Sequence, residues 1–266
     1  MNKVEPTPIL DTLKRYGSSR LFLTAMVLSL LGAFLKYGYE IFVSIKWITV
    51  NPSADIAAAI VTLSAAIVAL VFAILVFYGL FSTYRYYCEK TDTGSKLLFA
   101  IRMLGLSYIA ECAFFVAELF TVGGDDSSLT VGIIMLVGLF FLYAVFYRGI
   151  KITSEFEEHA AANSPRGRIS GAVIAILLAV IIIYLAIIAV QLFIGGRALF
   201  LPSSDAEAQA QQVSDVIVNL INLFILAPTM LSCVYFLKLM RLFRSDMNEA
   251  REVWAEIERK AKRSGL

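Results

Sequence analysis

Histidine is almost absent from this chain: His159 is the single one among 266 residues. A metal centre built from several histidines is therefore excluded, including the multi-histidine di-iron centre of membrane desaturases. Only three cysteines occur, Cys88, Cys112 and Cys233, and none of them form a CxxC pair that would indicate a zinc or redox site. No HExxH, GxSxG or Walker sequence occurs either. We therefore expect no enzyme, no metal site and no cofactor.

Charge is also scarce, because only 17% of the residues are Asp, Glu, Lys or Arg, against about 25% in a typical soluble domain. Hydrophobic residues make up 59% of the chain and occur in long runs. A helix needs about 20 apolar residues to cross the roughly 30 Å of hydrocarbon in a bilayer. The runs are too continuous for the alternating strands of a membrane barrel. Six transmembrane helices are predicted, at about residues 21–43, 56–81, 97–121, 129–150, 169–194 and 214–240.

The Lys and Arg residues are distributed asymmetrically between the connections. All but four of the 23 fall in the N-terminal segment, in the second and fourth connections and in the C-terminal tail. Cytoplasmic segments carry the excess of Lys and Arg, so this pattern predicts a multi-pass protein of the cytoplasmic or inner membrane with both termini in the cytoplasm. The predicted organisation is a cytoplasmic N-terminal segment (1–20), a transmembrane domain (21–244) and a cytoplasmic tail (245–266).

The two terminal segments have the pattern of amphipathic helices. The apolar residues of the tail recur at helical spacing: Met247, Ala250, Trp254, Ile257 and Ala261. We expect the tail to continue the sixth span as one helix, and residues 8–17 to form a short helix at the membrane interface. The predicted partners are the lipid bilayer and, through residues 245–266, either a second copy of the chain or a cytoplasmic protein. No nucleic-acid partner is predicted.

The odd-numbered spans resemble one another at their outer ends. Each places an acid or amide two residues before a phenylalanine: Glu40, Glu118 and Gln191. The even-numbered spans end in aromatic and basic residues, which suggests three related helical hairpins with a polar outer rim. A common origin is not required, because any helix end at a membrane interface favours aromatic and basic residues. The repeat therefore stays an open hypothesis.

Four polar residues fall at similar depth within the spans: Lys36, Glu111, Tyr184 and Asn222. Lys36 and Glu111 are roughly 21–22 Å from the cytoplasmic edge at a rise of about 1.5 Å per residue. Because a lone charge in hydrocarbon is costly, we expect these two residues to form an ion pair. Two interpretations remain open. The layer borders an outward-open vestibule that binds an ion, a proton or a small solute, or it only joins the helices by polar contacts.

A proline interrupts the sixth span. Pro228 lacks an N–H and therefore removes one backbone hydrogen bond from the helix. The position predicts either a hinge or a static kink whose freed backbone group is satisfied by Thr229 or Ser232.

The predicted fold class is all-α, a polytopic integral membrane protein with a six-helix bundle. The predicted function is that of a channel- or transporter-like component with a polar intramembrane layer. The alternative is a non-transporting scaffold or accessory subunit that recruits a partner through its cytoplasmic tail. The layout of spans, N-terminal segment and cytoplasmic connections also suits the permease half of an ABC-2-type exporter, although no motif carries that likeness.

Overall fold

The computed structural model describes residues 8–50, 56–122, 171–200 and 206–263, and the regular structure in these ranges is entirely helical. The all-α fold is therefore confirmed for the described part of the chain. The helices are α1 (Pro8–Gly17), α2 (Arg20–Val50), α3 (Ile56–Tyr87), α4 (Leu97–Val122), α6 (Gly171–Phe200) and α7 (Ala206–Arg263).

Three of these helices are long and apolar enough to cross a membrane: α2, α3 and the Val216–Glu249 stretch of α7. A helix satisfies its own backbone hydrogen bonds, which is why apolar runs of this length adopt it in lipid. The chain is therefore a helical protein whose long apolar helices indicate a membrane location. α4 and α6 cover the third and fifth predicted spans. The fourth predicted span, at 129–150, lies outside the described residues.

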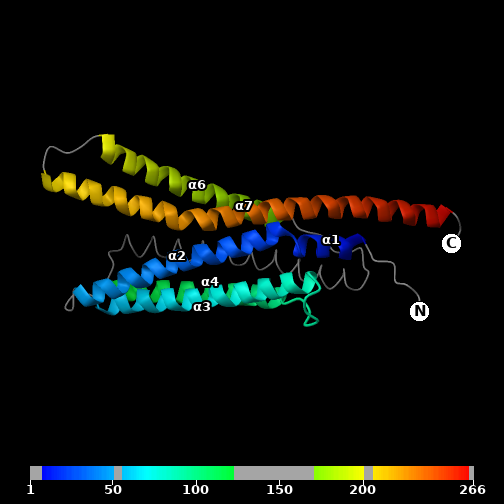
Figure 1. The fold of residues 1–266 in the computed structure, drawn as a ribbon, viewed down its shortest axis with the longest axis horizontal. Helices are drawn as coiled ribbons and strands as arrows, with labels where there is room; N and C mark the ends of the chain where they lie inside the picture. Colours follow the sequence, from blue (N-terminus) through cyan, green and yellow to red (C-terminus); the bar gives the residue numbers. More distant parts are fainter. Residues whose placement is uncertain (1–7, 51–55, 123–170, 201–205, 264–266) are drawn as a thin grey trace.

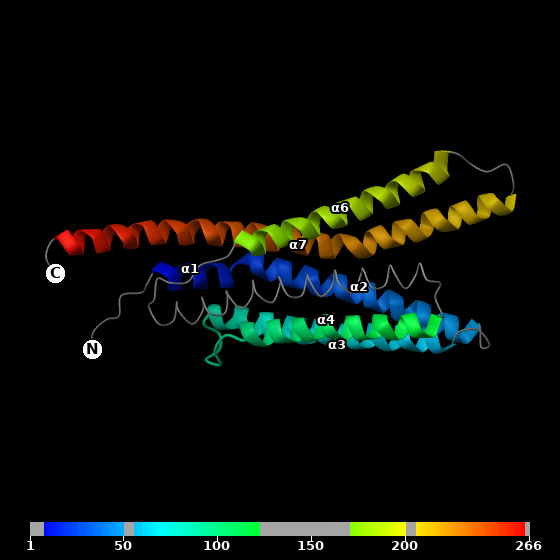
Figure 2. The same cartoon turned by 180° about the vertical axis from the view of Figure 1, so that it is seen from behind.

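The long helices pack as a series in which α2 lies at the centre, between α3 and α7 (Figure 1). α3 packs against both α2 and α4, α2 packs in turn against α7, and α7 packs against α6. The view from behind shows the same order, with α1 beside α7 at the end of the bundle where the C-terminal part of α7 emerges (Figure 2). This order leaves α4 and α6 on opposite sides of the α2–α7 pair.

Small residues bring α2 and α7 close together near Pro228. A Cβ added to Gly32 would overlap the hydroxyl oxygen of Thr229 and lie 3.0 Å from its backbone nitrogen. Two turns of α2 earlier, Ala25 is fully buried, and its carbonyl accepts a hydrogen bond of 2.7 Å from the Ser232 hydroxyl. Ser232 therefore joins the two helices instead of satisfying the backbone of α7. Interhelical contacts through small and hydroxyl side chains are typical of membrane bundles.

α7 continues through Pro228 as one helix of 58 residues and ends at Arg263. The predicted continuity between the apolar run at 214–240 and the tail is therefore confirmed, since both belong to one helix. The helix changes direction along its orange stretch in Figure 1, as expected where a proline removes a hydrogen bond. Thr229 and Ser232 hold this stretch against α2. Whether Pro228 acts as a hinge stays a prediction.

The helix predicted at residues 8–17 is confirmed as α1, and it packs on the emerging part of α7. Its place at the membrane interface stays a prediction. Five side chains form this contact, which we call the α1–α7 cluster: Leu13, Tyr16, Tyr87, Phe243 and Met247. The hydroxyl of Tyr16 donates a hydrogen bond of 2.7 Å to Asp246, which also lies 3.6 Å from Arg15. Burial and this hydrogen bond raise the pKa of Tyr16 above its ordinary value.

Candidate binding cavity

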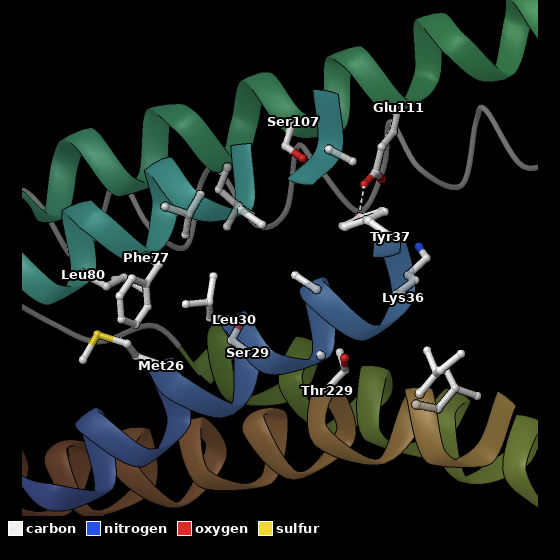
Figure 3. Close-up of a pocket in the computed structure, with 18 of the residues that line it drawn as sticks. Met26, Ser29, Leu30, Lys36, Tyr37, Phe77, Leu80, Ser107, Glu111 and Thr229 are labelled. Atoms are coloured by element: carbon white, nitrogen blue, oxygen red, sulfur yellow. Dashed lines mark hydrogen bonds between the residues drawn. The ribbon is translucent and has the colours of Figure 1, made fainter. Parts of the chain in front are cut away.

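A cavity of about 220 Å³ lies among the five long helices that the structure describes. Figure 3 shows it bordered by α2, α3 and α4, with α7 beneath. α2, α3 and α4 contribute most of its wall, α7 contributes Ile225, Leu226 and Thr229, and α6 contributes Tyr184. Among the described residues, the backbone of α4 packs against α3 and not against α2, α6 or α7. Side chains of helices that are separated in the packing series therefore meet at this cavity.

One end of the cavity carries two opposite charges on either side of a tyrosine. The hydroxyl of Tyr37 donates a hydrogen bond of 2.9 Å to Glu111 Oε1 (Figure 3). The ammonium nitrogen of Lys36 lies 4.9 Å from the centroid of the Tyr37 ring, within the range of a cation–π contact. Glu111 and Tyr37 are half-buried and Lys36 is exposed. A single side chain of α2 thus contacts both charged groups.

The expected direct ion pair between Lys36 and Glu111 is not formed. Among the described ion pairs, none joins these two residues within 4.0 Å. The sequence placed Lys36 and Glu111 at a similar depth in the membrane. In the structure, however, it is Tyr37 that lies next to the Glu111 carboxylate. A tyrosine hydroxyl satisfies a half-buried carboxylate at less cost than bringing a second charge out of water.

The rest of the cavity wall changes from hydroxyl groups to apolar side chains. Ser29, Ser107 and Thr229 line its middle, and Met26, Phe77, Leu80 and Leu104 line the apolar part. Figure 3 shows Met26, Phe77 and Leu80 gathered away from Glu111 and Lys36. The cavity is therefore amphipathic, with charges at one end and an apolar pocket at the other.

Stacked aromatic rings continue from the apolar end of the cavity. The ring of Phe77 lies 5.8 Å from Phe81, and Phe81 lies 6.4 Å from Tyr84. Tyr84 in turn stacks on Phe22 at 6.5 Å. Tyr84 is one turn before the end of α3, and Phe22 is in the first turn of α2. Aromatic side chains thus fill the space between the cavity and the end of the bundle that carries α1.

Three of the four residues predicted to share a layer line this cavity: Lys36, Glu111 and Tyr184. Asn222 does not line it and lies one turn before Ile225 and Leu226, the first residues of α7 that do. That Asn222 shares the depth of the other three residues stays a prediction.

The predicted outer rim is described only at Glu40. This residue lies in α2, one turn beyond Lys36, and is half-buried. The side chains of Glu118 and Gln191 lie outside the described ones, so the rim and the three-hairpin repeat stay predictions.

Sequence reasoning missed Tyr37, Ser29, Ser107 and Thr229 as cavity residues. A signal existed for two of them: Ser29 is seven residues before Lys36 and Ser107 is four residues before Glu111, which places each on the face of a charged residue. The tyrosine gave no such signal, because the chain has 12 tyrosines and they are common near helix ends.

Within the described residues, no group of three or more His, Cys, Asp or Glu side chains is placed to hold a metal ion. What the cavity offers is hydrogen bonding, one negative charge and one positive charge. The chain matches no protein-family model, no curated protein sequence and no solved structure. Function is therefore inferred from the cavity and the helices around it.

Proposed function

We propose that this protein is a six-span, channel- or transporter-like membrane component whose central cavity binds an ion or small solute. The apolar helices α2 and α3 and the Val216–Glu249 stretch support the membrane assignment. α4 and α6 supply two further spans in this proposal, and the sixth is the apolar run at 129–150.

The orientation that we propose puts both termini in the cytoplasm. The α1–α7 cluster joins α1, the end of α3 and the emerging part of α7, so these three segments lie at one end of the bundle. Basic residues are concentrated in the same segments: Lys14, Arg15, Arg85, Arg241 and Arg244. Because Lys and Arg are retained on the cytoplasmic side, this end is the inner one. The charged end of the cavity then faces the outer half of the membrane.

The observation that carries the proposal is the arrangement of Lys36, Tyr37 and Glu111 around open volume. Polar contacts that only joined the helices would need no open volume beside the two charges. Instead, Tyr37 lies between them beside a cavity of about 220 Å³. Intramembrane charges that border a cavity are typical of substrate and ion pathways.

The replacement of Glu111 by glutamine tests this function. In liposomes that contain the full chain, we expect Glu111→Gln to lower solute or ion flux by roughly tenfold or more, because one charge-assisted interaction with the solute is lost. Glutamine keeps the size of the side chain and still accepts the hydrogen bond from Tyr37, so the bundle is retained. Flux is measured with a pH-sensitive dye, a potassium-sensitive dye and radiolabelled solutes.

Glu252→Gln is the matched control, because Glu252 is exposed on the C-terminal part of α7 and distant in sequence from every cavity residue. Its flux should equal that of the unmodified chain. If the unmodified chain moves none of these probes, or if Glu111→Gln moves them as fast, the cavity is not a transport site.

A second candidate function, that of a scaffold, is favoured by the length of α7. Its 58 residues extend about 87 Å at a rise of about 1.5 Å per residue, far more than a bilayer requires. In Figure 1 the red end of α7 runs past α1. The apolar stripe that begins with Phe243 and Met247 continues beyond the α1–α7 cluster at alternating spacings of three and four, the pattern of a coiled-coil seam.

Removal of residues 250–266 tests this second function and leaves Met247 and the rest of the α1–α7 cluster in place. We expect the truncated chain to lose association with a second copy, which is measured as the protein mass by light scattering in detergent. Association with a cytoplasmic protein is measured by copurification from native membranes. If mass and copurifying proteins are the same for both chains, the tail does not serve as a docking helix. Liposome flux should not change on truncation.

A further inference from the structure

The two charges of the cavity retain capacity for a ligand. Glu111 accepts one hydrogen bond from the described residues, that of Tyr37, whereas a carboxylate offers about four acceptor positions. The Lys36 ammonium faces the Tyr37 ring and makes no ion pair with a described carboxylate, although an ammonium has three N–H donors. Tyr37 therefore contacts both charged side chains, while the two do not pair directly with each other.

A ligand with a single charge would compensate only one of the two charged side chains, Lys36 or Glu111. A cation at Glu111 would leave the Lys36 charge to be compensated, and an anion at Lys36 would leave the Glu111 charge. An uncompensated charge is costly in the low dielectric of a membrane bundle. A ligand with both an ammonium and a carboxylate matches both side chains and adds no net charge to the site.

The remaining wall specifies the rest of the ligand. The hydroxyls of Ser29, Ser107 and Thr229 follow the charged end, and the apolar side chains of Met26 and Phe77 form the other end. The volume of about 220 Å³ lies below the roughly 300–1,000 Å³ of pockets that hold drug-sized ligands. This volume fits a compact ligand with one apolar group and is too small for a lipid with acyl chains.

From this arrangement we infer that the cavity binds a small zwitterion, with an ammonium toward Glu111, a carboxylate toward Lys36 and an apolar group toward Met26 and Phe77. An apolar α-amino acid is the simplest molecule of this class. The inference rests on the proposed function, because it names the solute class of the same cavity. Tyr37 is a positioning residue in this arrangement, since it holds Glu111 away from Lys36.

The first experiment compares three ligands of one shape on the full chain in lipid nanodiscs. L-leucine carries both charges, isocaproate lacks the ammonium and isoamylamine lacks the carboxylate. Binding is measured by calorimetry and by the thermal shift of the folded protein. We expect leucine to bind roughly 10- to 100-fold more tightly than either analogue, because each analogue loses one charge-assisted interaction. Equal binding of leucine and either analogue would overturn the inference.

The second experiment assigns each charge to its side chain. Glu111→Gln should weaken the binding of leucine and isoamylamine but not that of isocaproate, whereas Lys36→Gln should weaken the binding of leucine and isocaproate but not that of isoamylamine. Tyr37→Phe should weaken leucine while it preserves the ring, because Glu111 is then released to pair with Lys36. Wild-type leucine affinity in all three variants would contradict the arrangement. If a variant does not purify as a single helical species, the comparison of the three ligands on the unmodified chain still tests whether the cavity binds a zwitterion.

The outcome separates this inference from the proposed function. If the liposomes show Glu111-dependent flux of protons or potassium while leucine neither binds nor moves, the cavity is a transport site but not one for zwitterions. If leucine binds with the expected charge dependence but no probe moves, the ligand class is correct and the protein is not a transporter. If neither is observed, both proposals are wrong.

Discussion

Replacement of Gly79 by leucine is expected to separate α3 from α4 and to abolish the stable fold. A Cβ at Gly79 would lie 2.7 Å from the Cβ, 2.9 Å from the nitrogen and 3.0 Å from the Cα of Ala100. These are backbone atoms and a Cβ, which no rotamer change can move, so one helix must shift. Extra atoms in a packed core usually cost about 1–3 kcal/mol, and a whole leucine side chain at a backbone contact should reach or exceed the upper value.

The consequence of Gly79→Leu is measured as the thermal midpoint and monodispersity of the detergent-purified chain. The shift of α4 would also displace Glu111 from Tyr37, so ligand binding should be lost together with stability. Gly38→Leu is the matched control, because a Cβ at Gly38 in α2 would meet no atom of another described helix within 4 Å. Leucine there should be neutral or slightly stabilising, since glycine is a poor helix former. If both leucine variants melt alike, the close contact of α3 and α4 does not determine stability.

Replacement of Phe243 by alanine is expected to release α1 from α7. Phe243 is only 3% exposed, and its ring meets Tyr16 edge-on at a centroid distance of 5.6 Å. Deletion of a buried phenylalanine side chain costs about 3–5 kcal/mol. The loss should be local, because the α1–α7 cluster is the main contact that holds the ten residues of α1. Hydrogen exchange of the α1 amides should become much faster, with little change in α3.

Leu242→Ala provides the control for this prediction, because the neighbouring Leu242 is 40% exposed. It removes an apolar side chain from the same turn of α7 without removing one from the α1–α7 cluster. Exchange in α1 should then stay at the rate of the unmodified chain. Equal exchange in both variants would mean that the cluster does not fix α1.

The local sequence pattern was sufficient to predict where α1 lies and that α7 is one continuous helix. Residues 8–17 have an amphipathic period and form α1 with the same limits, and the period of the tail continues the sixth span into one helix that ends at Arg263. These features depend on residues that are three and four positions apart in the chain, so they can be read from the sequence alone. The fold class and the membrane character followed from long apolar runs for the same reason, although only three helices meet the requirement for a span in the described residues.

The sequence also identified which residues belong to the cavity more reliably than how they interact. Counting along each helix brought Lys36, Glu111 and Tyr184 to one level, and all three line the cavity. It could not show that Tyr37 rather than Lys36 bonds Glu111, because that depends on the rotation of α2 against α4. The contact of Gly79 with Ala100 was hidden for the same reason.

What the sequence alone determined is therefore each helix as a separate element: its approximate extent, its apolar length and the depth of its charges. Tertiary structure alone decided which faces meet, and with them the cavity, its separated charges and the α1–α7 cluster. The physical reason lies in the surroundings. In a soluble protein, an apolar stripe on a helix marks the face that is buried against its neighbours. Lipid is as apolar as a packed core, so the sequence of a membrane helix does not show which of its faces packs against another helix.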